Sequence, residues 1–227
     1  MNRDILYFAP GTCARVALTA LEEIGEPFEA RLVAFLAGEH RSPDYLALNP
    51  AGAVPTLVTN SGPITQNCAI LWYLARTNPE AGLLPRTNSL FEEAGQIRQL
   101  THFAADLHPA VSRLVVPFLY AASPQGQDEL RSSSNEKLAF LLADKERILS
   151  GSDWLLGGEW SILDSYLGWV WFRITGAGFD PAPFPAIFAH YQRLNSRPAV
   201  QRVLAREAEA QDELRARGLA IPGVNNG

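Results

Sequence analysis

The sequence contains only two cysteines and four histidines among 227 residues, and it has no long apolar run. Two cysteines, Cys13 and Cys68, cannot build a disulfide framework. The histidines are scattered and offer no metal-ligand spacing. No apolar segment approaches the roughly 20 residues that a membrane-spanning helix needs. We therefore expect neither a bound metal nor a membrane span.

Positive charge is also scarce, because 19 Lys and Arg residues face 24 Asp and Glu residues and the formal net charge is -5. The only lysines are Lys137 and Lys145, and no basic block stands out. Nucleic acid is not an expected partner, since phosphate binding requires clustered cations. The first residues lack the apolar region and cleavage site of a signal peptide, which predicts a cytoplasmic protein.

The first 80 residues switch between strand and helix patterns. Strands are predicted at Ile5–Phe8, Phe28–Val33, Thr56–Thr59 and Pro63–Thr65, and helices at Ala14–Ile24, Pro43–Leu48 and Cys68–Arg76. A strand–helix–strand opening implies a parallel pair joined by a right-handed crossover. The turn between the last two strands implies a hairpin, so the sheet is mixed and has four strands.

A stretch rich in Pro, Gly and Asn, Arg76–Asn88, ends the strand signals. Helices are predicted beyond it at Leu90–Leu119, Glu136–Leu149, Ser161–Ile174, Pro185–Leu194 and Ala199–Gly218. The sequence therefore predicts an α/β domain at residues 1–79, a linker at 80–89, and an all-α domain at 90–227 with a loosely held C-terminal tail.

Cys13 stands at the predicted start of a helix, after the Pro10-Gly11 turn. A helix N-terminus favours an anion, so it can lower the pKa of a thiol there, and the Thr12 hydroxyl can donate to the same sulfur. The alternative is a buried cysteine that acts as a small hydrophobe. No second cysteine follows at C-x-x-C spacing, so any disulfide partner must be a small-molecule thiol.

Two later segments also allow ligand binding. A cis bond at Val54-Pro55 would expose the Val54 backbone to an extended, peptide-like ligand, and a plain trans turn is the alternative. Gln66 and Asn67 open a helix after a strand, where free N–H groups suit a carboxylate. The alternative there is N-capping by Asn67 or Thr65.

In this order, the features resemble the cytosolic glutathione S-transferase family, and most closely its bacterial, beta-type members. The family motifs are P-G-x-C at Pro10–Cys13, N-P-x-G-x-V-P at Asn49–Pro55 and L-T-E-[SG]-x-A-I-x-x-Y-[LI]-A at Ile64–Ala75. The segments FAADLHPAVSRL and SILDSYL resemble the family's fourth helix and its helix-capping box. The resemblance covers essentially the whole chain. It implies a thioredoxin-like N-terminal domain, an all-α helical bundle and a homodimer.

The resemblance also implies roles for individual residues toward glutathione. Val54, before a cis Pro55, would pair its backbone with the cysteinyl part, and Cys13 and Thr12 would lie beside the glutathione sulfur. The residues that would hold the γ-glutamyl carboxylate are Gln66 and Asn67.

In the helical half, His108 matches the family's fourth-helix histidine that faces the active cleft. Asp106 matches an acidic position that reaches the neighbouring subunit's glutathione. Where the family has an acidic residue at the start of its third helix, this chain has Gln66. The family's lysine is missing near Ala37, and His40 or Arg41 is the candidate replacement.

We therefore expect a glutathione S-transferase with a role in detoxification. It would bind glutathione as a thiolate, stabilised by electrostatic preorganisation, and transfer it to a small apolar electrophile. Candidate lining residues for the electrophile are Phe8, His108, Phe118 and Tyr166–Phe172. One alternative is a Cys13-dependent thiol transferase, disulfide oxidoreductase or thiolytic lyase. Another is a non-catalytic binding module on the same fold.

Overall fold

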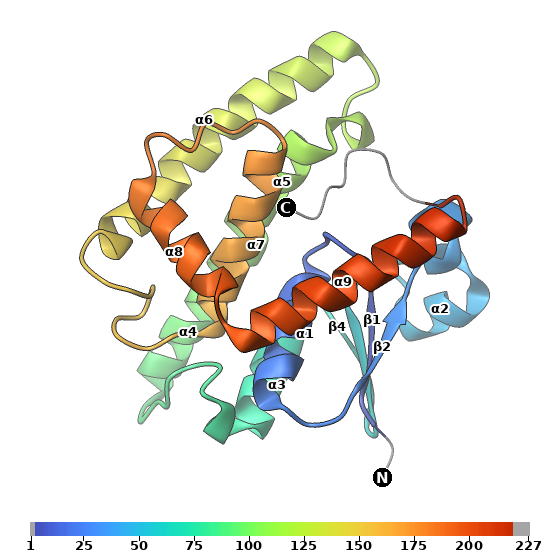
Figure 1. The fold of residues 1–227 in the computed structure, drawn as a ribbon, viewed down its shortest axis with the longest axis horizontal. Helices are drawn as coiled ribbons and strands as arrows, with labels where there is room; N and C mark the ends of the chain where they lie inside the picture. Colours follow the sequence, from blue (N-terminus) through green and yellow to red (C-terminus); the bar gives the residue numbers. More distant parts are fainter. Residues whose placement is uncertain (1–2, 220–227) are drawn as a thin grey trace. The chain divides into compact units, whose positions relative to one another are not determined.

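The computed structural model describes residues 3–219, and contacts divide the chain into two compact units (Figure 1). The first unit joins the N-terminal residues through Leu83 to the segment that begins at Ser196, and the second unit is Leu84–Asn195. Nearly all of the predicted loose tail lies outside the described residues.

The first unit is built on a four-stranded mixed sheet in the order β2-β1-β3-β4. The strands are β1 (Ile5–Phe8), β2 (Glu29–Leu32), β3 (Thr56–Thr59) and β4 (Gly62–Thr65). β1 pairs with β2 in parallel, and β3 pairs with β1 and β4 in antiparallel orientation. The predicted α/β class and mixed sheet are thus confirmed.

Two helices of the first unit, α1 (Ala14–Ile24) and α3 (Asn67–Thr77), pack against the sheet and against each other. The fully buried side chains Leu6, Leu18, Leu57 and Ile70 form the core between these layers. α1 ends at Gly25, whose left-handed backbone (φ 78°) suits a residue without Cβ. α2 (Pro43–Leu48) begins with Ser42 as its N-cap.

The last helix, α9 (Pro198–Ala216), belongs to the first unit and lies along α1 (Figure 1). The sequence predicts this helix as part of the C-terminal domain. Its helical periodicity is visible in the sequence, but the surface against which its apolar side packs depends on the tertiary structure. The predicted boundaries of the linker and of the domains stay predictions.

The second unit is all helical, as predicted. Its helices are α4 (Leu90–His102), a π-helical turn η4 (Phe103–Leu107), α5 (His108–Val115), α6 (Pro124–Leu149), α7 (Ile162–Gly176) and α8 (Pro185–Asn195). Short 3₁₀ turns also occur in the chain, at Phe35–Ala37 (η1), Glu39–Arg41 (η2), Pro79–Ala81 (η3) and Pro117–Leu119 (η5). Within residues 3–219, no helix combines the length and the apolar character that crossing a membrane requires.

The predicted helix Leu90–Leu119 is interrupted twice. Pro109 has no N–H group to donate back along the helix, and the His108 N–H bonds to the Phe103 carbonyl in the π-helical turn just before it. Pro117 then closes the segment, so α5 ends at Val115 with Val116 as its C-cap. The predicted helical pattern is thus present from Leu90 to Val115 with a π-helical turn inside it, and only its end at Leu119 was placed too late.

The predicted helix Glu136–Leu149 starts twelve residues too late, since α6 begins at Pro124. The missed residues are mostly polar and include Gly126 and three successive serines, so they carry little apolar periodicity. The helix starts there because Ser123 accepts the Gly126 N–H at 3.1 Å, with Pro124 at the first helical position.

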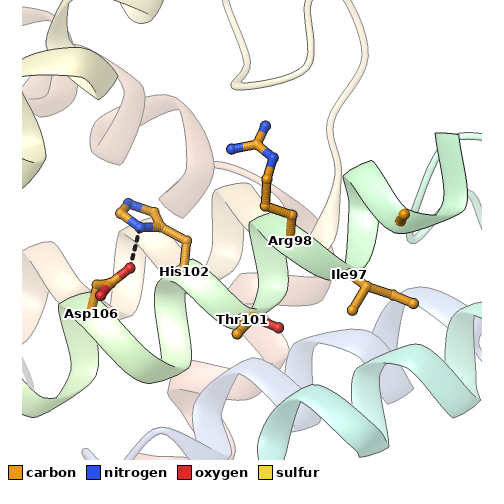
Figure 2. A pocket seen from close by; sticks show the side chains of 6 residues that line it. Ile97, Arg98, Thr101, His102 and Asp106 are labelled. Carbon is orange, nitrogen blue, oxygen red and sulfur yellow. Dashed lines mark hydrogen bonds and ion pairs between the residues drawn. The ribbon is translucent and has the colours of Figure 1, made fainter. Parts of the chain in front are cut away.

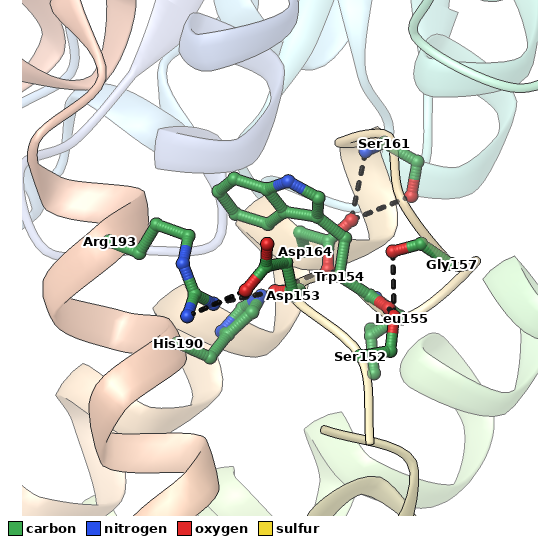
Figure 3. A network of polar contacts seen from close by, with 9 residues as sticks. All are labelled: Ser152, Asp153, Trp154, Leu155, Gly157, Ser161, Asp164, His190 and Arg193. Atoms are coloured by element: carbon green, nitrogen blue, oxygen red, sulfur yellow. Dashed lines mark hydrogen bonds and ion pairs between the residues drawn. The ribbon is translucent and has the colours of Figure 1, made fainter. Parts of the chain in front are cut away.

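A buried carboxylate organises the start of α7 (Figure 3). Asp164 is fully buried and accepts from the Ser161 N–H (2.8 Å), the Ser161 hydroxyl (2.9 Å) and the Leu155 N–H (2.8 Å). His190 of α8 contacts the same carboxylate at 2.9 Å. The capping box predicted at Ser161–Asp164 is present, and it also joins α7 to α8 and to the loop before it.

We expect Asp164→Ala to destabilise the protein by about 2–4 kcal/mol, because the change leaves several buried donors without an acceptor. Asp128→Ala is the control, since Asp128 makes an exposed pair with Arg131. It should cost less than about 1 kcal/mol. Urea denaturation measures both values, and equal losses in the two variants would contradict the assignment.

Candidate active site

The turn from Pro10 to Cys13 connects β1 to α1. Gly11 is buried and has φ 73°, in the left-handed region that favours glycine. The Thr12 hydroxyl donates to the Ala9 carbonyl at 2.7 Å, and its oxygen accepts the Ala14 N–H at 3.3 Å. Thr12 therefore caps the first turn of α1, and its hydroxyl proton points at the protein's own backbone.

The Cys13 side chain connects this turn to the segment before β3. Cys13 is 8% exposed, and its thiol donates to the Val54 carbonyl at 3.7 Å. The Cys13 carbonyl accepts the Asn67 Nδ2–H at 3.1 Å. Three segments that are distant in sequence therefore meet at Cys13, one through its thiol and one through its carbonyl. The structure brings together Cys13, Val54 and Asn67, and their roles toward a ligand stay predictions.

A buried polar network holds the backbone next to Val54. The Ala53 carbonyl accepts from the Tyr45 hydroxyl (2.6 Å) and from Asn49 Nδ2 (2.7 Å), and Asn49 also donates to the Thr56 hydroxyl at 3.0 Å. The Val54-Pro55 peptide bond is cis. The sequence analysis gave these supporting residues no role, although Asn49 lies in one of the motifs that it used.

Gln66 and Asn67 lie at the start of α3 but in different environments. Gln66 is exposed and has φ 70°, whereas Asn67 is 7% exposed and is the first helical residue. Neither Asn67 nor Thr65 caps α3 with its side chain, so the capping alternative is wrong. Asn67 Oδ1 is buried and has no hydrogen-bond partner among the described residues, which leaves an acceptor for a ligand N–H.

His40 lies in the short turn η2, where its Nε2 accepts from Arg41 Nε at 3.2 Å and its ring contacts Phe35 edge-on. Burial and the neighbouring Arg41 lower the pKa of His40. A neutral imidazole does not replace the charge of the missing lysine, whereas the exposed Arg41 carries a permanent positive charge.

His108 and Asp106 belong to the second unit. His108 Nδ1 lies 3.4 Å from the Tyr166 hydroxyl, and its ring packs edge-on against Trp169 at 4.7 Å. Burial lowers the pKa of His108 to about 4. Phe118 is exposed, whereas Phe8 and the aromatic side chains of Tyr166–Phe172 are buried in their respective units.

Asp106 pairs with His102 at 2.8 Å, one helical turn away, as expected from their spacing. Figure 2 shows both side chains at a hollow of about 540 Å³ on α4, which is also lined by Ala94, Ile97, Arg98 and Thr101.

Neither the second thiol nor the acidic groups form a second candidate site within residues 3–219. Burial raises the pKa of the Cys68 thiol to about 11, so this cysteine stays protonated at neutral pH. Within residues 3–219, no three His, Cys, Asp or Glu side chains are grouped so that they could hold a metal ion.

One contact to the Cys13 turn was not predicted at all. Glu207 of α9 accepts the Gly11 N–H at 3.2 Å and pairs with Arg15 at 2.6 Å. Arg15 and Glu207 are 192 residues apart, and neither belongs to a local motif. No signal in a single sequence could have paired them.

Comparison with known proteins places this geometry in a family. Residues 11–77 match the model of the glutathione S-transferase N-terminal domain. A glutathione S-transferase of Xanthomonas campestris is 34% identical over 89% of this chain and 98% of its own. A sphingomonad glutathione S-transferase, solved in complex with glutathione, is 33% identical over 90% of this chain and 98% of its own, with a TM-score of 0.78. The beta-class enzyme of Sphingomonas chungbukensis is 31% identical over 89% of this chain and 98% of its own, with the same TM-score.

The chain belongs to the glutathione S-transferase family. Its thioredoxin-like first unit and its helical second unit have that family's fold. The predicted family and fold are therefore confirmed, including the similarity to bacterial beta-class members. The named relatives are transferases, which favours an enzyme over the non-catalytic alternative.

We expect the His108 imidazole to titrate near pH 4, well below its ordinary value of about 6.5. The cause is burial, which disfavours the charged form. The unfolded chain binds this proton at higher pH than the folded chain does. The stability contribution is therefore present above about pH 6.5 and is lost as pH falls toward about 4.

NMR titration of the histidine ring signals measures this value, and His108→Gln identifies the signal. A midpoint near 6.5 for His108 would contradict the expectation.

Proposed function

We propose that this chain binds glutathione at the start of α1 and transfers it, as a thiolate, to an apolar electrophile. The family makes the chain an enzyme of the transferase class with glutathione as its cosubstrate. The observation that carries the assignment to this site is the meeting of the Cys13 thiol, the Val54 carbonyl and the Asn67 side chain.

The cysteinyl and γ-glutamyl parts of glutathione each have a partner of suitable chemistry in the first unit. The Val54 carbonyl takes the N–H of the cysteinyl residue, as in strand addition, and this places the glutathione sulfur beside Cys13. The N–H groups at the start of α3 take the γ-glutamyl carboxylate, with Gln66 next to it. The free Oδ1 of Asn67 accepts from the γ-glutamyl amino group.

The thiolate is stabilised at the first turn of α1. The first N–H groups of a helix have no partner within the helix, and its dipole favours an anion. Cys13 donates its S–H, and Thr12 donates once its hydroxyl rotates away from Ala9. No base is needed after the thiolate has formed, so the site acts by charges and dipoles that are in place beforehand.

The second substrate is a small apolar electrophile in this proposal. His108 supports it, because burial keeps this imidazole neutral beside the aromatic rings of Tyr166 and Trp169, so it adds no charge to this region. A detoxification role is consistent with such a substrate. The chain has only two cysteines, too few for a disulfide framework, which supports a cytoplasmic location.

The buried Cys13 thiol at this position also favours a second candidate function. The Cys13 thiolate could attack a glutathione disulfide, form the mixed disulfide of Cys13 with glutathione and release the other sulfur as a thiolate, which takes up the proton lost from Cys13. A second glutathione thiolate would then reduce the mixed disulfide. This is the thiol transferase, oxidoreductase or thiolytic chemistry considered above.

Cys13→Ser should separate these functions. We expect the variant to keep conjugation of glutathione to an aryl halide within about 10-fold in kcat/KM, a loss of about 1.4 kcal/mol or less. Disulfide exchange should be lost. Steady-state assays of both reactions give the result, and Cys68→Ser is the control because its thiol stays protonated.

Loss of conjugation by more than about 100-fold in Cys13→Ser, together with a mixed disulfide in the mass spectrum of the wild type, would support the covalent function instead.

We further propose that the chain forms a homodimer through the exposed face of α4. Leu90, Phe91 and Ile97 are 83%, 89% and 47% exposed, and helical spacing puts them on the same side as the hollow in Figure 2. Exposed apolar side chains beside a hollow fit a second copy of the same face. Asp106 lines the hollow, which is consistent with its expected role toward the neighbour's glutathione.

Phe91→Glu should weaken this dimer at least about 10-fold, because it buries a charge in an apolar interface. Analytical ultracentrifugation measures the mass against 24.9 kDa for one chain. Phe140→Glu, which changes an equally exposed phenylalanine on α6, should have no effect. A wild-type protein that is monomeric at micromolar concentration would refute the proposal.

A further inference from the structure

A series of ion pairs connects α9 to the C-terminal end of α1. Arg197 pairs with Glu23 at 2.8 Å, and Arg202 and Arg206 both pair with Glu22 at 2.6 Å. These arginine side chains are partly exposed. They attach α9 to α1 away from the candidate active site.

Glu207 differs from these residues because it is fully buried and reaches the Cys13 turn. Its Oε1 accepts the Gly11 N–H at 3.2 Å, and its Oε2 accepts from Nε (2.9 Å) and Nη2 (2.6 Å) of Arg15. The Arg15 side chain is 8% exposed. One carboxylate thus joins the backbone of the turn, the first turn of α1 and α9.

Stability alone is a weak reason for this arrangement. A buried ion pair contributes little net stability, because desolvation offsets the attraction, and apolar residues of similar size often do as well. A hydrogen bond to a charged acceptor is, however, stronger than one to a neutral acceptor. It therefore fixes the peptide unit at Gly11 more firmly than a turn could do by itself.

The bond from Gly11 to Glu207 affects the candidate site because of where Gly11 lies in the turn. Gly11 precedes Thr12 and Cys13, and its left-handed backbone directs the chain into α1. The Thr12 N–H bonds to Ala9, and the Arg15 N–H bonds to Thr12, so the turns follow one another without a break. The orientation of the Thr12 and Cys13 residues therefore depends on the orientation of the Gly11 peptide.

We propose that Glu207 is a positioning residue for thiolate formation: by holding the Gly11 N–H, α9 fixes the turn that presents Thr12 and Cys13 to the glutathione sulfur. The inference rests on the proposed role of Thr12 and Cys13. Arg15 neutralises the carboxylate, so that Glu207 can accept the bond without adding net negative charge beside an anion.

Two double variants isolate the Gly11 bond. Arg15→Met with Glu207→Gln removes both charges and keeps an oxygen that can accept the Gly11 N–H. Arg15→Met with Glu207→Leu removes both charges and the acceptor. The readout is the pH dependence of the thiolate absorbance of bound glutathione, together with kcat and KM.

We expect the Gln double variant to resemble the wild type. In the Leu double variant, the pKa of the bound glutathione thiol should rise by about one unit, and kcat/KM below that pKa should fall about 10-fold. Glu22→Gln is the control, because it weakens the partly exposed pairs with Arg202 and Arg206 without touching the turn. It should lower the thermal midpoint and leave the thiol pKa unchanged.

Equal thiol pKa values and equal kcat/KM in the two double variants would overturn the inference. If the Leu double variant does not fold, Arg15→Met with Glu207→Ala gives the same comparison. Thr12→Val and Cys13→Ala, which remove the two side-chain donors, tell this failure from a failure of the proposed site. If they raise the thiol pKa and the Leu variant does not, only Glu207 loses its role. If none of these changes moves the pKa, the proposed sulfur site is itself refuted.

Discussion

The hydrogen bond from Asn67 to the Cys13 carbonyl is the constraint on which the candidate site depends. It spans 54 residues and joins the first residue of α3 to the residue that precedes α1. Two helix N-termini, each with a partial positive charge, are therefore held close together. In the absence of an anion such an arrangement is unfavourable. A tripeptide with a carboxylate and a thiolate would offset this cost, which supports the proposed glutathione site.

The other side of the site is held by neutral groups rather than by charges. Asn49, Tyr45 and Thr56 are buried, and they satisfy one another and the Ala53 carbonyl. A network of this kind is rigid because each member would lose a hydrogen bond if the loop moved. It fixes the Val54 backbone next to Cys13 without altering the electrostatic potential at the sulfur. The charge at the turn is balanced separately, by Glu207 and Arg15.

In the second unit, too, a single buried side chain orders several segments, at the start of α7. Asp164 combines the usual helix cap with contacts to Leu155 and His190, so one carboxylate orders a helix, a loop and a second helix. The other buried side chains of α7 are almost all apolar. His108 lies against this aromatic core, and burial lowers its pKa to about 4, so it adds no charge there at neutral pH.

The sequence by itself determined the local elements and the motifs. The bounds of β1, α1, α2 and β3 were predicted to the residue, because apolar spacing, Gly25 and the Ser42-Pro43 start mark them. Cys13, Val54 and Asn67 were identified as site residues because each lies where a helix or a strand begins. Their roles toward glutathione rest on the resemblance and stay predictions.

Tertiary structure alone decided the rest. The polar first half of α6 has no apolar periodicity, so only its cap and its packing make it helical. The assignment of α9 to the first unit, and the contact of Glu207 with Gly11, depend on which surfaces pack together. The sequence around a charged residue in the middle of a helix does not identify its partner, because only the fold brings that partner within hydrogen-bond distance.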